Sequence, residues 1–210
     1  ALAATAVLGA SLLISGCGSS TNNASSSGSK EVLKIAANPV PHAEILEQVK
    51  PILAKEGVDL QIVEFTDYIQ PNMALSSHEV DANFFANVPY QNNYNKDHGT
   101  NFVSFAPVHI EPLAIYSQKI KDLKDLPNGA KVAIPSDPTN SARALLLLQS
   151  AGLVTLKDPT GLTNTPFDVT SNPKNIQIVE LEAAQIPRSI QDLDAAVINA
   201  NYALPAGLNP

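Results

Sequence analysis

The sequence predicts an α/β protein, because short apolar segments suited to strands alternate with helical patterns along most of the chain. Two observations carry the prediction most strongly. Residues 131–134 and 195–198 are apolar runs of strand length, and each passes into polar residues. The run 142–148 has the pattern of a long apolar helix, with Gly152 just past its end.

The remaining elements follow the same logic of apolar spacing and turn residues. The strand candidates in chain order are 32–37, 58–65, 80–85, 102–108, 113–116, 131–134, 176–179 and 195–198. Helical spacing covers 43–53, with Pro51 expected to kink or restart the helix, and a polar helix is expected at 89–98. Pro71 suits the first position of a short helix, and Thr139 or Asn140 is the expected N-cap of the helix that contains Arg143.

The first part of the chain resembles an export signal rather than part of the fold. Residues 1–16 are predicted to be a partial secretory signal peptide, whose apolar run is too short to span a bilayer. Small residues precede Cys17 as in a lipobox, so we expect a diacylglycerol on this thiol; the alternative is a free or buried Cys. Residues 17–29 are Ser-rich and polar, which predicts a lipidated, flexible tether at the extracytoplasmic face of the membrane.

Composition and motifs exclude several classes of function. Acidic residues outnumber basic ones by 20 to 13 without a basic cluster, which argues against nucleic acid as a partner. The four histidines show no metal-ligand spacing, so no metal or cofactor is expected. The sequence has no phosphate loop and no nucleophile elbow. Asp81 and Glu111 could serve a hydrolase, but nothing in the sequence pairs them, and we expect no enzyme.

Two polar residues are candidates for ligand binding. Arg143 lies near the start of a helix, where free N–H groups and a guanidinium fork together suit a carboxylate; pairing with a surface acid is the equal alternative. Asn199 ends an apolar strand, where α/β sheets place ligands, although a turn role is the simpler explanation of an Asn there. Five aromatic residues gather in one stretch and suit either core or pocket: Tyr68, Phe84, Phe85, Tyr90 and Tyr94.

Five ordered segments resemble one protein family. They are Phe65–Leu75 (FTDYIQPNMAL), Asp81–Phe85 with Pro89–Tyr90, Pro135–Leu145 (PSDPTNSARAL), Glu180–Ser189 and Ala196–Ala203. These segments are similar to those of the NlpA-type lipoproteins, the methionine-binding subunits of methionine ABC importers. The resemblance runs from about Val32 to the last residues.

The resemblance implies a periplasmic-binding-protein-like fold of type II, in which two α/β lobes close over one ligand. Lobe 1 would comprise 30–110 and lobe 2 would comprise 111–199, with 200–210 returning to lobe 1. Family members continue past this return, so the C-terminal part of the first lobe is expected to be missing and the chain to be truncated at both ends.

The resemblance also implies roles for individual residues. Arg143 would hold the carboxylate of an amino acid, and Asn199 would contact its polar head. Tyr68 and Phe85 would line the thioether pocket, and Asn87 stands at a pocket position where many members have His.

The function expected from these features is a lipid-anchored solute-binding protein that delivers L-methionine to an ABC permease and its ATPase. D-methionine, a methionine-containing dipeptide or another amino acid is the alternative ligand within the same fold. A surface interaction lipoprotein, such as an adhesin without transport, is the alternative from another class. Soft contacts between sulfur and aromatic rings, worth roughly 0.3–1.5 kcal/mol each, would favour methionine over leucine.

Overall fold

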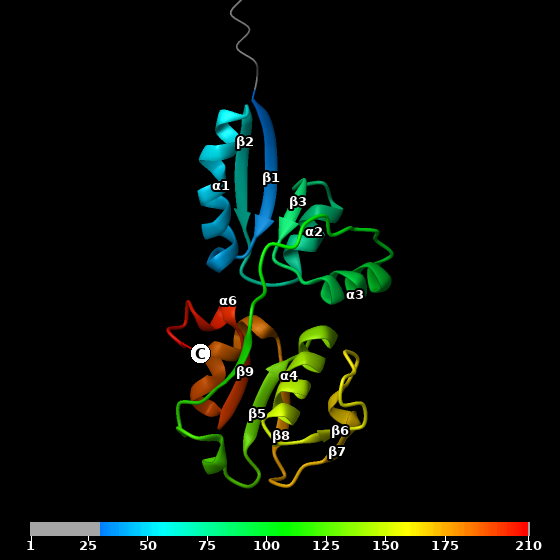
Figure 1. Ribbon diagram of the computed structural model, residues 1–210, viewed down its shortest axis with the longest axis vertical. Helices are drawn as coiled ribbons and strands as arrows, with labels where there is room; N and C mark the ends of the chain where they lie inside the picture. The colour runs from blue at the N-terminus through cyan, green and yellow to red at the C-terminus, as the bar shows by residue number, and fades with distance from the viewer. Residues whose placement is uncertain (1–29, 210) are drawn as a thin grey trace, which may run out of the picture.

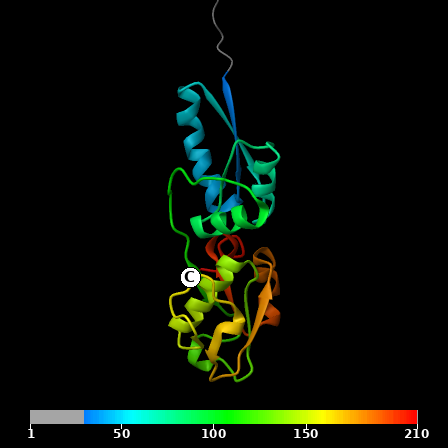
Figure 2. The same ribbon diagram turned by 90° about the vertical axis from the view of Figure 1, so that its right-hand side faces the viewer.

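The structure is a computed structural model that describes residues 30–209, and it consists of two lobes stacked along the long axis of the molecule (Figures 1 and 2). The predicted signal peptide, the lipidation site Cys17 and the tether lie outside the described residues. The expected α/β class is confirmed, because each lobe has a sheet with helices packed against it.

The first lobe contains a three-stranded parallel sheet with the order β2-β1-β3. Its strands are β1 (Glu31–Ala37), β2 (Val58–Glu64) and β3 (Ala82–Phe84). Its helices are η1 (Pro39–Ala43), α1 (Glu44–Lys55), α2 (Gln70–Ser76) and α3 (Val88–His98). Apolar residues of α1 and α2 form two separate clusters with this sheet, one around Leu60 and one around Val80. The sheet is therefore covered by helices rather than open to water.

The structure differs from two expectations in this lobe, the restart of the helix at Pro51 and the strand at 102–108. Helix α1 continues through Pro51 without a break, and Pro51 is exposed, so the carbonyl group that loses its bond can face water. Residues 102–108 form no strand; they belong to an extended connection that runs from α3 to the second lobe. Side chains such as Val103 and Phe105 are exposed there, because the described residues offer this segment no neighbouring strand with which to pair.

The second lobe contains a mixed sheet with the order β4-β9-β5-β8. Its strands are β4 (Leu113–Tyr116), β5 (Lys131–Pro135), β8 (Gln177–Leu181) and β9 (Ala195–Asn199), and only β4 is antiparallel to its neighbour. Strand β9 is buried along its whole length, which explains why its sequence is a continuous apolar run. A two-stranded ribbon, β6 (Thr155–Leu156) with β7 (Val169–Ser171), lies beside this sheet.

Helices cover both faces of the second sheet. On one face, Leu145 and Leu148 of α4 (Pro138–Ser150) pack with Val132 and Val197 of the strands. On the other face, Ile186 and Ala203 pack with Ile198. The elements that carry this second face are α5 (Ile186–Ser189), η5 (Ile190–Asp192) and α6 (Ala200–Ala203), and the remaining short turns are η2 (Leu123–Asp125), η3 (Pro166–Asp168) and η4 (Ala183–Gln185).

The carboxyl ends of the parallel strands of both lobes lead into the region where the lobes meet. In the first lobe, β2 runs into Tyr68 and β3 runs into Phe85. In the second lobe, β5 runs into the start of α4 and β9 ends at Asn199. Because open α/β sheets place ligands at the carboxyl ends of their strands, the fold directs attention to the junction between the lobes.

Candidate functional site

Arg143 and Asn199 meet at one buried side chain in the second lobe, that of Asn140. Arg143 Nη1 donates a hydrogen bond of 2.8 Å to Asn140 Oδ1, and Asn199 Nδ2 donates one of 3.1 Å to the same oxygen. The second guanidinium nitrogen, Nη2, donates to the backbone carbonyl of Glu111 at 3.2 Å. The two residues selected from the sequence therefore lie together, held by an amide that the sequence analysis did not select.

The start of α4 explains how this cluster is positioned. Asp137 is the N-cap, and its carboxylate accepts from the backbone N–H of Asn140 and from the side-chain Nδ2. The predicted N-cap, Thr139 or Asn140, was wrong. Pro138 is the first helical residue, since its fixed φ suits that position, and this places Arg143 in the second turn rather than the first.

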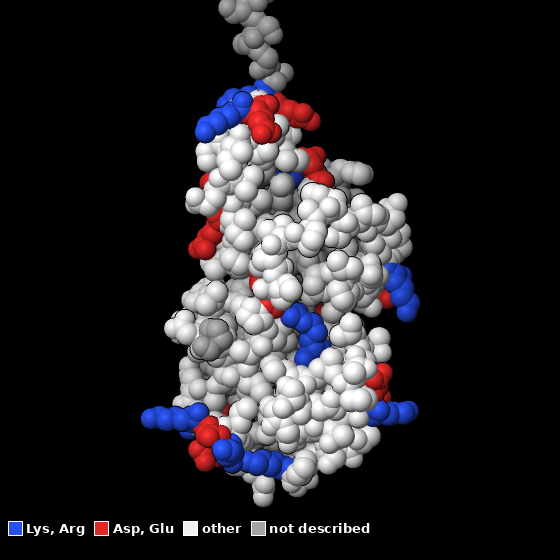
Figure 3. Space-filling view, in the orientation of Figure 1, with Lys and Arg blue, Asp and Glu red and all other residues white. Residues whose placement is uncertain are grey.

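The guanidinium of Arg143 is partly buried and has only neutral hydrogen-bond partners. Within residues 30–209, no ion pair within 4.0 Å includes Arg143. Burial lowers the pKa of the guanidinium, while the nearby Tyr68, Asp137 and Glu111 act in the opposite direction. Since an arginine stays protonated at neutral pH, the site keeps a positive charge without a bound anion. Figure 3 shows atoms of Lys or Arg side chains, coloured blue, in the hollow between the two lobes.

Four aromatic rings lie opposite this cluster and form what we call the aromatic wall: those of Tyr68, Phe85, Tyr90 and Tyr202. The ring centroid of Tyr68 is 5.9 Å from that of Phe85, 6.0 Å from that of Tyr90 and 4.9 Å from that of Tyr202. Of these rings, Tyr202 comes from α6 and the other three come from the first lobe. Burial raises the pKa of Tyr68, Tyr90 and Tyr202 well above the usual tyrosine value, so all three hydroxyl groups stay protonated.

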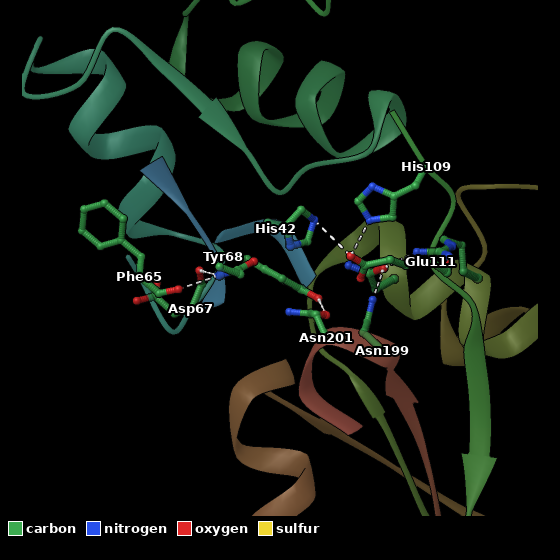
Figure 4. Close-up of polar contacts among 11 residues, drawn as sticks. His42, Phe65, Asp67, Tyr68, His109, Glu111, Asn199 and Asn201 are labelled. Carbon is green, nitrogen blue, oxygen red and sulfur yellow. Dashed lines mark hydrogen bonds and ion pairs between the residues drawn. The ribbon is translucent and has the colours of Figure 1, made fainter. Parts of the chain in front are cut away.

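At this wall, one hydrogen bond joins Tyr68 of the first lobe to α6, the helix that packs on the second sheet. The hydroxyl of Tyr68 donates to Asn201 Oδ1 at 2.6 Å, and both residues are buried, with exposed fractions of 8% and 4% (Figure 4). Tyr90 in turn donates its hydroxyl to the backbone carbonyl of Tyr68 at 2.6 Å. Asn201 follows β9 within a segment already noted in the sequence, but nothing there indicated a partner 133 residues earlier.

Asn87 has a structural contact that the sequence analysis did not anticipate. Its Oδ1 accepts the backbone N–H of Tyr90 at 2.8 Å, which makes Asn87 the N-cap of α3. The cap places Asn87 beside the aromatic wall, because Tyr90 belongs to it.

A hollow of about 460 Å³ lies where α3 approaches the start of α4, and its lining residues are Pro89, Asn92, Asn93, Lys96, Pro138, Thr139, Leu162 and Thr163.

A third group gathers at the lobe junction, where Nε2 of both His42 and His109 lies 3.0 Å from Glu111 Oε1. The expectation that no metal is bound rested on the spacing of the histidines along the chain, and that spacing does not show that two of them share one carboxylate partner in the fold. The fold brings together His42 of η1 and His109 of the connecting segment. Glu111 therefore has two imidazole partners, whereas Asp81 accepts the backbone N–H of Lys34, so the carboxylates considered for a hydrolase have separate partners.

Comparison with known proteins identifies the relatives of this arrangement. The sequence profile of a family described as NlpA lipoprotein matches residues 33–210. The D-methionine-binding lipoprotein MetQ of Salmonella typhimurium is 44% identical over 212 residues, which covers 99% of this chain and 76% of the relative. The MetQ protein of Escherichia coli is 48% identical over 170 residues, covering 80% of this chain and 62% of the relative.

Solved structures resemble the fold closely. A nutrient-binding protein from Burkholderia cenocepacia bound to methionine superimposes with a TM-score of 0.81 at 47% identity, covering 85% of this chain and 76% of that one. A periplasmic substrate-binding protein of an ABC transporter from Coxiella burnetii gives a TM-score of 0.81 at 45% identity, covering 85% and 75%. The fold and the lobe junction thus define a two-lobed solute-binding protein of the kind that serves ABC transporters.

The chain belongs to the NlpA lipoprotein family. The resemblance stated from the five sequence segments is confirmed, and so is the fold class that it implied. The relatives named above are binding proteins and not enzymes. Within residues 30–209, no helix is long and apolar enough to cross a bilayer.

Proposed function

We propose that this chain binds methionine between its two lobes and delivers it to the permease of an ABC importer. In this proposal, residues 30–110 and 111–199 act as the two lobes, and residues 200–210 return to the first. A lipid on Cys17 holds the protein at the extracytoplasmic face of the membrane. The methionine-binding relatives support methionine as the substrate class.

The observation that carries the proposal is the partly buried positive charge of Arg143, which has no carboxylate partner among the described residues. A charge removed from water is costly unless it is paired, so this site favours the entry of an anion. The planar guanidinium can hold a carboxylate through two parallel hydrogen bonds. The carboxylate of an amino acid fits this requirement.

The groups around Arg143 suit the rest of a methionine molecule. The side-chain amide oxygen of Asn199, Oδ1, is buried without a partner among the described residues, and it can accept a hydrogen bond from the ligand ammonium group. Tyr68 and Phe85 offer ring faces for the apolar tail, where a thioether gains soft contacts that an aliphatic chain lacks. Asn87 uses Oδ1 as a helix cap, so we assign its Nδ2 to the pocket side.

The test is calorimetric titration of the delipidated chain with L-methionine, D-methionine, leucine and glycyl-methionine. We expect binding of at least one methionine compound and weaker binding of leucine. Clear binding of another solute, with none of any methionine compound, would overturn the ligand assignment. The comparison of the two enantiomers decides which form the site accepts.

Arg143→Ala is the matching variant, because it removes the proposed carboxylate receptor. We expect loss of methionine binding and loss of methionine uptake in cells that depend on this importer. Arg188→Ala is the control, since Arg188 is an exposed arginine on α5 in the same lobe. If Arg143→Ala binds and transports methionine like Arg188→Ala, the proposed site is wrong.

A further inference from the structure

The His42, His109 and Glu111 group has the composition of a metal site. The ligand atoms of these three side chains all lie within 4.8 Å of one another, and the two Nε2–Oε1 distances are both 3.0 Å. Figure 4 shows both imidazole rings directed at the carboxylate. The ring centroids of the two histidines are 5.1 Å apart.

The distances are close to those that a zinc ion requires. Zinc lies about 2.0–2.1 Å from imidazole nitrogen and about 2.0–2.2 Å from carboxylate oxygen, so two ligand atoms of a tetrahedral ion are roughly 3.3 Å apart. The two observed nitrogen–oxygen distances of 3.0 Å need only a small expansion. The three ligand atoms span up to 4.8 Å, so the widest pair must close by roughly 1.5 Å to reach that geometry. His109 is exposed on an extended segment, so its side chain is able to make the larger adjustment.

The protonation of the group is compatible with cation binding. Burial, followed by the neighbouring His109, lowers the pKa of His42 to about 4, so its ring is neutral at neutral pH. A neutral imidazole is the form that binds metals. The Nδ1 atom of His42 is buried and has no hydrogen-bond partner among the described residues, whereas the 3.0 Å contact between Nε2 and the Glu111 carboxylate places the ring proton on Nε2 while no ion is bound. In the tautomer without that proton, a cation would separate the Nε2 lone pair from the carboxylate.

We infer that His42, His109 and Glu111 bind one divalent transition-metal ion, with zinc as the ion that suits the donor set best. Two imidazoles and one carboxylate favour zinc over magnesium or calcium, which prefer oxygen ligands alone. A fourth position would remain for water or another ligand. This site goes beyond the proposed function, and neither proposal requires the other.

The position of the three ligands gives the ion a structural consequence. His42 follows β1 of the first lobe, whereas Glu111 lies two residues before the start of β4 in the second lobe and its backbone carbonyl accepts a hydrogen bond from Arg143. A bound ion would therefore connect the two lobes beside the carboxylate receptor. We expect metal binding to raise the thermal unfolding midpoint of the chain, because the ion binds only the folded arrangement.

The test uses the full chain without a histidine tag, in a Cys17→Ser background, after removal of metals with a chelator. Zinc chloride is titrated calorimetrically, and cobalt(II) replaces it for a visible absorption spectrum. We expect one zinc per chain and an intense cobalt band of tetrahedral type. His109→Ala and Glu111→Gln should each weaken zinc binding at least about tenfold and abolish that band, since even the loss of an outer-shell partner costs about 10–100-fold.

His78→Asn is the control, because His78 is exposed and distant in sequence from the group, and its φ of 59° is one that Asn tolerates. This variant should bind zinc with the wild-type affinity and stoichiometry. His109 is exposed, so His109→Ala should fold normally, and circular dichroism checks that it does. Absence of stoichiometric zinc binding by the wild type, or equal binding by wild type and His109→Ala, would overturn the inference.

Discussion

Asn140 joins the polar groups of the candidate site, so Asn140→Ala is the most informative single change. The side chain is only 2% exposed, and its Oδ1 accepts from Arg143 and from Asn199. Its Nδ2 donates to both carboxylate oxygens of Asp137. Removing the amide leaves Asn199 Nδ2 without its acceptor and frees the guanidinium to rotate.

The size of the effect follows from these contacts. The oxygen of Asn199 is already buried without a partner, so in the variant neither polar atom of this amide keeps the partner seen here. A buried group without its hydrogen bond costs about 1–3 kcal/mol, and the weaker loss at the half-buried Arg143 adds to it, which gives roughly 2–4 kcal/mol of stability. Loss of guanidinium orientation should weaken methionine binding by about tenfold, which corresponds to about 1.4 kcal/mol.

Two assays separate stability from positioning. Urea unfolding measures the free energy of unfolding, and calorimetry at a temperature where both proteins are folded measures the affinity for methionine. Asn95→Ala is the matched control, because the Asn95 side chain makes three hydrogen bonds, to Phe102 and Thr100, near the far end of α3, compared with four for the Asn140 side chain. The control should lose stability and keep its affinity. An Asn140→Ala protein that binds methionine as tightly as wild type would refute the positioning role.

Three further predictions concern stability. Tyr68→Phe should cost roughly 1–3 kcal/mol in urea unfolding, because it leaves buried Asn201 without its 2.6 Å donor, and unchanged stability would show that the bond contributes nothing. With chelator present, the contribution of His42 to stability should rise as the pH increases from about 4 to 6.5 and then level off, because burial lowers its pKa to about 4 and the unfolded chain binds the extra proton in that range. His42→Gln should flatten this dependence. If the difference between the urea unfolding midpoints at pH 4.5 and pH 7 is the same in His42→Gln as in the wild type, the prediction is wrong. Leu145→Ala should destabilise by about 2–5 kcal/mol and Leu147→Ala by less, because Leu145 is completely buried in α4 and Leu147 is not.

Local apolar pattern predicted most of the secondary structure. The strands at 131–135 and 195–199 and the helix at 138–150 appear where the apolar runs placed them, because these segments form the core of the second lobe. The failure at 102–108 has a physical cause. An apolar, β-prone segment forms a strand only where it pairs with another, and residues 102–108 lie in the connection between the lobes and pair with no strand among the described residues.

The candidate site was predictable only in part. Arg143 and Asn199 were selected because they lie at a helix start and a strand end, and they do meet. Asn140 was missed as their common partner. It had been considered only as an N-cap of the helix, and that role alone accounts for an Asn at this position of the sequence. The true cap is Asp137, and the choice between neighbouring polar residues depends on where Pro138 starts the helix.

The sequence by itself determined the class of fold, the family and the strand ends at which polar groups gather, because periodicity and turn residues act over a few neighbours along the chain. Only the tertiary structure decided that Tyr68 bonds Asn201 and that His42 and His109 share Glu111. The Tyr68–Asn201 and His42–Glu111 contacts join residues more than 60 positions apart, and they depend on how two separately packed sheets direct their carboxyl ends toward one junction. Burial at that junction lowers the pKa of His42 and so makes its ring neutral at neutral pH, whereas Arg143 keeps its charge there because an arginine stays protonated.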